Sequence, residues 1–394
     1  MRTRINAPLA ARAETSSDHV DKIRIIFAGP FDPTLCDGVS SSVFDLSTFL
    51  RSQGHEVLIV SFVESSPLTR RMLNHLHESQ TEPISSDRDH FHYVWHGINV
   101  HFALVPFTAH DVLNCHPGVL ERYITKLSEY KGSYFFTADD DFTCLLVRSI
   151  LKSKGAHVIH SPDRFIRRLN SMPIFKRVLG SGTIFTVSNF SRGELQKELG
   201  VSALVWPPYI SSERFRFANL SRRSLKIGYY SAGPHKGDSM ITALARQMTD
   251  RQFVVIGRGY RGDVDSANVT YLGETERLES FYTGISLLLV PSLVPEGYSR
   301  VILEASMNAI PVIANKIGGI PEAIGRSGIA FDVEPLERTM VDKYSSAITE
   351  LLCDPRLYLE YSNRALERAK EYEEELHEIS VLHSDTFLKT EGAA

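Results

Sequence analysis

The chain has 394 residues, of which 43% are hydrophobic and 23% are charged, a composition typical of a globular protein with two domains. Its formal net charge of −4 excludes a general basic field for nucleic acid, so any anionic ligand must be bound by local groups. The longest apolar runs, such as 285–290, are far shorter than the roughly 18 residues that span a bilayer, and we expect no transmembrane segment.

Residues 1–21 are polar and Ala-rich and lack the apolar core of a secretory signal, which predicts a flexible tail. The cysteines, Cys36, Cys115, Cys144 and Cys353, lie far apart and have no CxxC spacing of a zinc or disulfide framework. A reducing compartment fits best. We therefore expect a cytoplasmic protein, with peripheral contact at the inner face of a membrane left open.

The first half of the chain alternates short β-branched runs with amphipathic stretches. Ile23–Ala28 predicts a strand, and Glu56–Ser61 predicts the next one, as in a parallel βαβ unit. Between them a helix that stops at Gly54 is expected, with one apolar face made of Val39, Val43, Leu46 and Leu50. Ser191 and Glu194 predict a capping box for a helix that stops at Gly200. Further strands are expected at Tyr134–Thr137, His157–His160, Ile184–Val187 and Leu204–Trp206.

Two prolines and mixed polar residues break this periodicity at 207–224, which we interpret as a linker. A second strand series follows, at Lys226–Tyr230, Phe253–Gly257, Val269–Gly273, Leu287–Val290, Pro311–Ala314 and Gly328–Phe331. The fold class is therefore α/β. Rossmann-like domains at 22–206 and 225–375, each a doubly wound parallel sheet, face each other across a cleft, and a helix at 376–394 packs at their junction.

The most informative segment, Ser286–Gly325, predicts a strand, a loop, a helix and a second strand. Ser299 is placed to cap a helix that runs to about Asn308, and the positive end of that helix suits a diphosphate. Glu296 lies in the preceding loop and Glu304 more than one turn inside the helix, so two carboxylates flank the anion pocket.

This segment resembles the family 4 glycosyltransferases of the GT-B fold, the glycosyl transferases group 1. The hallmark of that family is two glutamates separated by seven residues, here Glu296, GYSRVIL and Glu304, followed by small residues and the proline-led strand at Pro311. The resemblance implies that Glu296 contacts the donor sugar at the reacting centre and that Glu304 binds the ribose hydroxyls. The backbone of Gly297, Tyr298, Ser299, Arg300 and Val301 would hold sugar and phosphate. Two solvated glutamates on a loop and a helix are the alternative.

Other stretches resemble the same family. Gly38, beside Asp37 where the family often has a second glycine, would let the backbone approach the leaving diphosphate; the alternative is a tight turn without ligand. His160 aligns with a histidine that touches the transferred sugar, although a histidine at a strand end is more often structural. Lys236 matches a lysine that pairs with the diphosphate.

One position departs from the family pattern. An arginine usually stands five residues before the lysine, and here that residue is Ser231, which removes a charge-assisted contact of roughly 1.5–3 kcal/mol. Arg300 and Arg258 are the candidates to compensate. Arg300 is preferred for its place in the phosphate loop, and a solvent-facing arginine is the alternative. The family-like stretch Lys316–Glu322 is expected mainly to shape its loop.

Three polar clusters are assigned to structure first. His90, His92, His96 and His101 fall on an expected edge hairpin and are interpreted as solvated. Asp139, Asp140 and Asp141 are interpreted as acids at a helix N-terminus rather than a cation site. The basic stretch is either a solvated face or a contact for anionic lipid or an anionic acceptor; it contains Arg164, Arg167, Arg168, Lys176 and Arg177.

By resemblance, then, the expected activity is transfer of a sugar from a nucleoside-diphosphate sugar, of UDP or GDP type, to an acceptor hydroxyl. Retention at the anomeric carbon is implied, with no metal and no bound cofactor. Glu296 and His160 are the expected catalytic residues. Two rivals remain open: a phosphorylase or epimerase on the same architecture, and a catalytically silent sugar-nucleotide-binding protein, which Ser231 makes credible.

Overall fold

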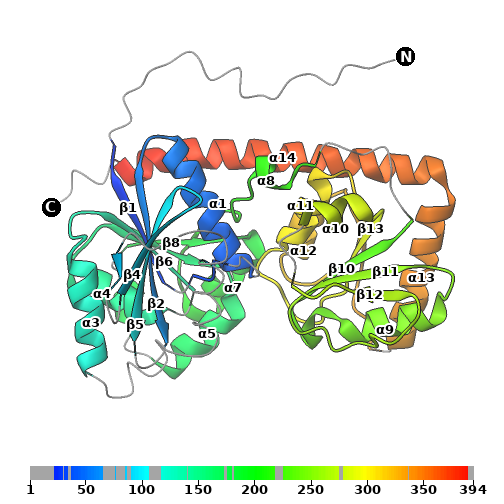
Figure 1. Cartoon of the computed structure of the whole chain (residues 1–394), viewed down its shortest axis with the longest axis horizontal. Coiled ribbons are helices and arrows are strands. Elements are labelled where there is room, and N and C mark those ends of the chain that lie inside the picture. Colours follow the sequence, from blue (N-terminus) through cyan, green and yellow to red (C-terminus); the bar gives the residue numbers. More distant parts are fainter. Residues whose placement is uncertain are drawn as a thin grey trace, which may run out of the picture.

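The computed structural model describes residues 22–29, 31–33, 37–64, 76, 85–86, 90–105, 117–139, 141–172, 175–179, 182–217, 225–274, 278–335 and 337–388. The expected tail at 1–21 and part of the expected linker lie outside these residues. Two α/β domains stand side by side, joined by the segment that contains α8 (Ser212–Phe215) and by the long helix α14 (Pro355–Leu388) (Figure 1).

The N-terminal domain is built on a nine-stranded sheet. Its order is β3 (Ser85–Ser86), β4 (His90–Trp95), β5 (Ile98–Val105), β2 (Glu56–Glu64), β1 (Arg24–Ala28), β6 (Tyr134–Ala138), β7 (Gly155–Ile159), β8 (Thr183–Thr186) and β9 (Leu204–Val205). From β5 to β9 the strands are parallel. The central strands are apolar runs because helices cover both faces of the sheet.

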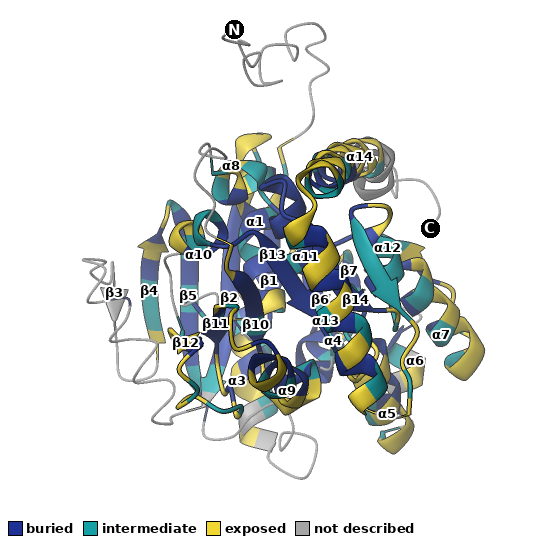
Figure 2. Ribbon diagram, turned by 90° about the vertical axis from the view of Figure 1, so that its right-hand side faces the viewer, coloured by how far each residue is buried: buried dark blue, intermediate teal, exposed yellow. Residues whose placement is uncertain are grey.

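The helices of this domain connect consecutive parallel strands. They are α1 (Gly38–Ser52), α3 (Pro117–Ser128), α4 (Phe142–Ile150), α5 (Pro162–Ser171), α6 (Phe175–Leu179) and α7 (Asn189–Leu199). Their outward faces are exposed, whereas the strands beneath them are mostly buried (Figure 2).

The C-terminal domain contains a six-stranded, all-parallel sheet in the order β12 (Val269–Tyr271), β11 (Phe253–Gly257), β10 (Ile227–Ser231), β13 (Leu287–Val290), β14 (Val312–Asn315) and β15 (Gly328–Phe331). This is the doubly wound dinucleotide-binding order. Its helices are η3 (Pro234–Lys236), α9 (Asp238–Gln247), α10 (Leu278–Gly284), α11 (Arg300–Met307), α12 (Ile320–Ile324) and α13 (Glu337–Cys353). The GT-B fold expected from the sequence is thus present, and each expected strand is found.

The junction helix is longer than expected. Instead of starting at 376, α14 begins at Pro355 on the C-terminal domain and runs across the N-terminal domain (Figure 1). At the junction it contacts the segment that joins the domains: the Tyr372 hydroxyl donates to the Pro208 carbonyl, and Glu373 pairs with Arg216 at 2.7 Å. The domain boundary at 375 therefore falls inside a continuous helix, because no glycine or proline interrupts the helical pattern there.

The edge hairpin is confirmed, with β4 and β5 antiparallel around a turn at His96 and Gly97, both of which have positive φ. His101 is not solvated, however. Its Nδ1 lies 2.7 Å from the Tyr130 hydroxyl, and burial, aided by the nearby His92, lowers its pKa to about 3.

The expected capping box is displaced by one turn. Ser188 is the N-cap of α7 and accepts from the Ser191 amide at 3.0 Å, whereas Ser191 lies inside the helix. A serine at each position offers the same local signal, so the sequence pattern could not choose between them. The stop at Gly200, in the left-handed conformation, is as expected.

Candidate functional site

A cleft of about 1040 Å³ lies between the two domains. It opens at the carboxyl ends of β1, β6 and β7 on one side and of β10 and β13 on the other. In each sheet the chain reverses its winding at that point, next to β1 and next to β10, which is where open α/β sheets bind ligands. The expected site residues that line it are Gly38, His160, Lys236, Glu296, Gly297, Tyr298, Ser299, Arg300, Val301 and Glu304.

The N-terminus of α11 faces this cleft. Ser299 is its N-cap residue and Asn308 its C-cap, so the expected helix bounds are confirmed. The side chain of Ser299 does not cap the helix; its Oγ is buried and has no hydrogen-bond partner among the described residues. Free backbone N–H groups, a positive helix end and an unused hydroxyl thus meet at one place, an arrangement that suits an anion.

Lys236 and Glu296 meet across this opening. Lys236 ends η3, which follows β10, and its Nζ lies 2.8 Å from Glu296 Oε1. Both side chains are mostly shielded from solvent but line the cleft. The two residues that the resemblance assigns to diphosphate and sugar are therefore direct neighbours.

Glu304 lies one turn into α11 and is only 5% exposed. Its Oε2 accepts a hydrogen bond from the Tyr282 hydroxyl at 2.6 Å, and Oε1 lies 3.5 Å from Arg300 Nε. Burial raises the pKa of the Glu304 carboxyl against the opposing effect of Arg300. A carboxylate has about four acceptor positions, so these two contacts leave acceptor capacity toward the cleft.

Glycines hold the Glu296 loop in place. The Gly319 amide donates to the Glu296 carbonyl at 2.7 Å, and a Cβ at Gly318 would press against the Glu296 backbone. A Cβ at Gly297 would collide with the His160 carbonyl of the opposite domain. The Lys316–Glu322 stretch thus shapes its loop, as expected, and Gly297 brings the two halves of the site together.

His160 follows β7 and is oriented by Asp139, which follows the neighbouring strand β6. His160 Nδ1 lies 3.1 Å from Asp139 Oδ2, while Asp139 Oδ1 accepts from the amides of His160 at 2.7 Å and Ser161 at 2.9 Å. Burial alone raises the pKa of Asp139, but the facing imidazole and these hydrogen bonds outweigh it and lower the pKa.

The interpretation of Asp139 as a helix acid is therefore wrong. Asp141 is the N-cap of α4 and accepts from the Cys144 amide at 3.0 Å, and Asp140 lies outside the described residues. Asp139 has a positive φ of 45°, rare for a non-glycine residue, and this turns its carboxylate toward β7. The sequence did offer a signal for this contact. Asp139 and His160 each follow a strand, and the adjacent strands β6 and β7 bring their ends together.

Asp139→Asn is expected to lower kcat roughly tenfold to a hundredfold with little change in the KM for donor. Asparagine retains an acceptor for the two backbone amides but loses the carboxylate oxygen that orients the imidazole. Steady-state kinetics test this, with Asp250→Asn, an exposed position between α9 and β11 that does not line the cleft, as the matched control. An unchanged kcat, or a rise in KM alone, would contradict an orienting role for Asp139.

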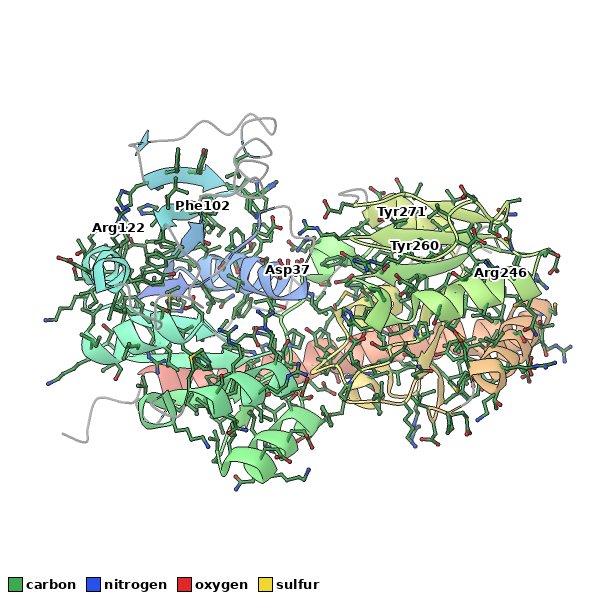
Figure 3. The ribbon with its side chains drawn as sticks, turned by 90° about the horizontal axis from the view of Figure 1, so that it is seen from below. Asp37, Phe102, Arg122, Arg246, Tyr260 and Tyr271 are labelled. Carbon is green, nitrogen blue, oxygen red and sulfur yellow. The ribbon has the colours of Figure 1, made fainter. Side chains whose placement is uncertain are left out.

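Gly38 is the first residue of α1, opposite α11. Asp37 is the N-cap of α1 and accepts from the Ser40 amide at 2.7 Å, which explains an aspartate where the family often has glycine. Figure 3 shows Asp37 at the end of α1 that faces the C-terminal domain. A Cβ at Gly38 would lie 3.5 Å from Arg300 Cδ, an ordinary contact, so the N-termini of α1 and α11 converge on the cleft.

Ser231, the departure from the family pattern, is fully buried at the end of β10. Its hydroxyl donates to Asp238 Oδ1 at 2.8 Å, and the Tyr229 hydroxyl donates to the same oxygen at 2.7 Å. The position therefore belongs to a network that fixes the start of α9.

Arg258 lies beside that position, because its neighbour Gly257 pairs with Ser231 in the sheet. The Arg258 side chain is 46% exposed; Nε pairs with Glu274, and Nη2 lies 3.5 Å from Asp32 Oδ2, at the cleft wall of the opposite domain. Of the two candidates for compensation, Arg258 is the one whose guanidinium remains accessible to solvent.

Arg300 does not lie in an open phosphate loop, and that expectation is corrected. Its side chain is 8% exposed and its guanidinium contacts α1, with Nη2 2.7 Å from Asp45 Oδ2 and Nη1 2.9 Å from Ser42 Oγ. Nη1 also donates to the Tyr209 carbonyl at 2.7 Å. Sequence reasoning missed Asp45, which is buried in α1 and gives no signal separate from other helix acids.

A second tie between the domains forms at α12. The Glu322 carboxylate accepts from the amides of Asn189 at 2.8 Å and Phe190 at 2.7 Å, and from Asn189 Nδ2 at 3.0 Å. A carboxylate of one domain thus caps the helix N-terminus of the other, where charge and dipole are complementary.

Glu322→Ala is expected to favour separation of the domains and to raise the KM for donor several-fold, since closure completes the cleft. Small-angle X-ray scattering should show a larger radius of gyration than for the wild type. Glu198→Ala, at the exposed far end of α7, is the control. Identical scattering profiles and KM values would exclude a role for Glu322 in closure.

The basic stretch lies partly on α5. Arg164 and Arg167 line the cleft on the side of the N-terminal domain, with Arg167 71% exposed and paired with Asp163 at 2.8 Å. Lys176 is exposed on α6, and the Arg177 side chain lies outside the described residues. Among the helices that the structure describes, none is long and apolar enough to span a membrane.

Comparisons with known proteins agree with this geometry. Residues 230–354 match the family model of the glycosyl transferases group 1. The chain is 28% identical over 224 residues to the GDP-mannose-dependent alpha-(1-6)-phosphatidylinositol monomannoside mannosyltransferase of Mycobacterium tuberculosis, covering 46% of this chain and 57% of the relative. The match thus spans little more than half the length of that relative.

Solved structures share the fold over most of the chain. Sucrose-phosphate synthase from Thermosynechococcus elongatus superposes with a TM-score of 0.69 at 17% identity, covering 93% of this chain and 99% of that one. The Anabaena protein HepE, in complex with UDP and glucose, superposes with a TM-score of 0.64 at 15% identity, covering 90% and 100%. The family match in the C-terminal domain and the GT-B fold shared over most of the chain support the resemblance of this chain to the family 4 type of glycosyltransferases, the glycosyl transferases group 1.

Proposed function

We propose that the chain transfers a sugar from a nucleoside-diphosphate sugar to an acceptor hydroxyl, with retention at the anomeric carbon. The contact between Lys236 and Glu296, at the N-terminus of α11 and opposite His160, is the observation that carries this proposal. A cation, a carboxylate and free backbone N–H groups thus surround one opening. The cation and the N–H groups suit a diphosphate, and the carboxylate suits the sugar attached to it.

The charges that develop during transfer match these groups. Negative charge grows on the leaving diphosphate, where Lys236 and the α11 N-terminus stabilise it. Positive charge grows on the sugar, where Glu296 and the oriented ring of His160 position it. Glu304, deeper in the cleft, receives the ribose hydroxyls. The proposal assigns no metal ion or bound cofactor, because Lys236 and the helix end supply the positive charge.

We assign GDP-mannose as the first donor to test, since the relative from M. tuberculosis is named as GDP-mannose-dependent. UDP-glucose is the second, because HepE was solved with UDP and glucose. A thermal-shift panel of GDP, UDP and their sugars should raise the melting temperature of one series, since a ligand that binds only the folded state stabilises it. No shift with any nucleotide would overturn the donor assignment.

Transfer itself needs a separate test. Release of GDP or UDP from the selected sugar nucleotide should be measured with methyl α-D-mannopyranoside as a trial acceptor, and the anomeric configuration of the product read by NMR. Inversion would refute retention. Nucleotide binding without turnover would instead support the silent binding protein, which the buried Ser231 favours, since no arginine stands at that position.

The acceptor side carries cations of its own. Arg164 and Arg167 line the cleft beside His160, which supports an acceptor with an anionic group or contact with an anionic lipid surface. Sedimentation with vesicles containing phosphatidylserine should be reduced by replacing both arginines with glutamine. If the wild-type chain does not sediment, contact with an anionic surface is excluded.

A further inference from the structure

Strand β7 and the two residues that follow it hold Asp139 in place. The Asp139 amide donates to the Val158 carbonyl at 2.8 Å, and the Asp139 carbonyl lies 2.8 Å from Nε2 of His157. The Asp139 carboxylate accepts from the amides of His160 and Ser161. These contacts support a positive φ of 45°, a backbone conformation that is unfavourable for a residue with a side chain.

His157 is 1% exposed, and both of its ring nitrogens have partners. Burial, aided by the nearby Arg148, lowers the pKa of His157 to about 3, so the ring is neutral at physiological pH. The Asp139 carbonyl can only accept a hydrogen bond, and Nε2 of His157 therefore carries the proton and donates it. Nδ1 is then an acceptor, and the Thr137 hydroxyl donates to it at 2.7 Å.

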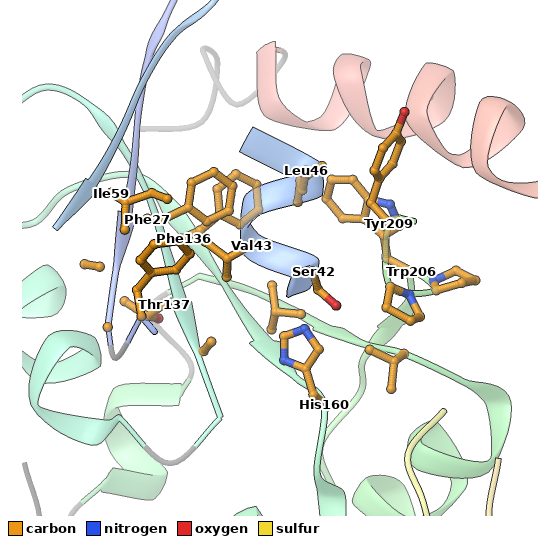
Figure 4. A pocket seen from close by; sticks show the side chains of 18 residues that line it. Phe27, Ser42, Val43, Leu46, Ile59, Phe136, Thr137, His160, Trp206 and Tyr209 are labelled. Atoms are coloured by element: carbon orange, nitrogen blue, oxygen red, sulfur yellow. The ribbon is translucent and has the colours of Figure 1, made fainter. Parts of the chain in front are cut away.

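These hydrogen bonds form a continuous series from the interior of the sheet to the cleft. Thr137 on β6 donates to His157 on β7, and His157 donates to the Asp139 carbonyl. The Asp139 carboxylate in turn faces Nδ1 of His160 at 3.1 Å. Figure 4 shows Thr137 and His160, the two ends of the series, with the His160 ring pointing toward α1. Because Nδ1–H of the neutral ring donates to Asp139, Nε2 of His160 is an acceptor in the wall of the cleft.

We propose that His157 is a positioning residue for sugar transfer: its hydrogen bond to the Asp139 carbonyl holds the backbone turn from which the Asp139 carboxylate orients His160. The proposal rests on the proposed function for the role of His160 in transfer. Without the His157 proton the Asp139 carbonyl loses a buried partner, and Asp139 is free to relax to a negative φ that moves its carboxylate away from His160. His157 acts only through Asp139, since it is buried and is not among the residues that line the cleft.

His157→Met is expected to lower kcat roughly tenfold to a hundredfold and to leave the KM for donor within about twofold of the wild type. Methionine fills a similar space but has no proton to donate to the Asp139 carbonyl. His157→Gln should keep kcat within about threefold of the wild type, because its amide nitrogen stands as many bonds from the backbone as Nε2 and donates in its place. A histidine that only stabilised the sheet would give no such difference between the two variants once urea unfolding has shown them to be equally stable.

The effect of His157 should be transmitted through Asp139. The double variant His157→Met, Asp139→Asn should have a kcat no more than about threefold below that of the slower single variant, whereas independent effects would multiply. Tyr130→Phe is the matched control, since it removes a hydroxyl 2.7 Å from the His101 ring, outside the cleft, and should leave kcat unchanged. If His157→Met does not fold, Thr137→Val provides the second variant; it removes the donor to Nδ1 and should lower kcat several-fold.

Nitrogen NMR of the histidine rings tests the same contacts without turnover, at about pH 8, above the ordinary pKa of histidine. In the wild type the proton of His157 is expected on Nε2 and that of His160 on Nδ1, with His160→Gln used to assign the His160 signals. In His157→Met the His160 signals should shift toward the mixture of tautomers of a free imidazole.

Unchanged His160 signals, or an unchanged kcat in folded His157→Met, would overturn the positioning role. Multiplying effects in the double variant would overturn it as well. The two proposals fail in different ways. If the wild type transfers no sugar but the His160 signals shift in His157→Met, the contact stands and the proposed function fails. If the wild type transfers sugar and the signals do not shift, the positioning role alone fails.

Discussion

Glu296→Gln is expected to reduce sugar transfer roughly 10²–10³-fold, the cost of removing a charged group that acts on the transition state. Its Oε1 lies 2.8 Å from Lys236 Nζ, so the substitution removes the negative charge that pairs with Lys236 in the absence of donor, although the amide oxygen can still accept a hydrogen bond. The affinity for nucleoside diphosphate should therefore remain the same or rise. Calorimetric titration of the nucleotide, alongside initial rates of transfer, measures both quantities.

Lys236→Met is the counterpart, with the opposite pattern. It removes a charge-assisted contact of roughly 1.5–3 kcal/mol, so nucleotide affinity should fall about tenfold or more. Lys316→Met provides a control, since Lys316 lies after β14 and pairs with Asp332 away from the cleft. If Glu296→Gln weakens nucleotide binding as much as Lys236→Met does, the division of roles between the two residues is wrong.

Arg300→Met is expected to destabilise the fold by about 3 kcal/mol, near the lower end for removing one partner of a buried ion pair. Asp45 is 1% exposed and would lose its contact with Arg300 Nη2 at 2.7 Å, although Arg214 Nη1 still lies 2.9 Å from Asp45 Oδ1. Urea unfolding monitored by circular dichroism should show the loss as a lower transition midpoint.

Two variants control this measurement. Arg246→Met removes an exposed arginine that pairs with Asp263, and its midpoint should match that of the wild type. Asp45→Asn combined with Arg300→Met should recover part of the loss, because the buried charge of Asp45 is then removed together with its partner. The recovery should be incomplete, because Glu304 also loses Arg300 and keeps only the hydrogen bond from Tyr282. A wild-type midpoint for Arg300→Met would show that the pair does not stabilise the fold.

Arg300→Met also tests which arginine compensates for the family arginine that Ser231 replaces. Because Arg300 is committed to α1, Arg258→Met should weaken nucleotide binding more than Arg300→Met does. If Arg300→Met instead weakened nucleotide binding more than Arg258→Met, Arg300 would be the residue that binds the phosphate.

Much of the fold could be predicted from sequence because the signal is local. Buried parallel strands read as continuous apolar runs, and β11, β13 and β15 have the bounds that their runs predict. The positions of Glu296 before a helix and of Glu304 inside it could likewise be predicted from the local periodicity alone. Ser188 and Ser191 are equally suitable as helix caps by their local sequence, so only the structure shows which of them is the N-cap of α7.

The sequence by itself indicated two α/β domains and the helix that begins after Ser299. The family resemblance added Gly38, His160 and Lys236 as residues of the same site. Only the tertiary structure decided how those residues are used. Asp139 lies beside His160 because β6 and β7 are neighbours in the sheet. The Arg300 side chain points away from the expected phosphate site because it pairs with the buried carboxylate of Asp45, which is distant in the chain. Charge pairing depends on the distance between the charged groups and on their burial. The spacing of residues along the sequence gives neither quantity when the two residues belong to different domains.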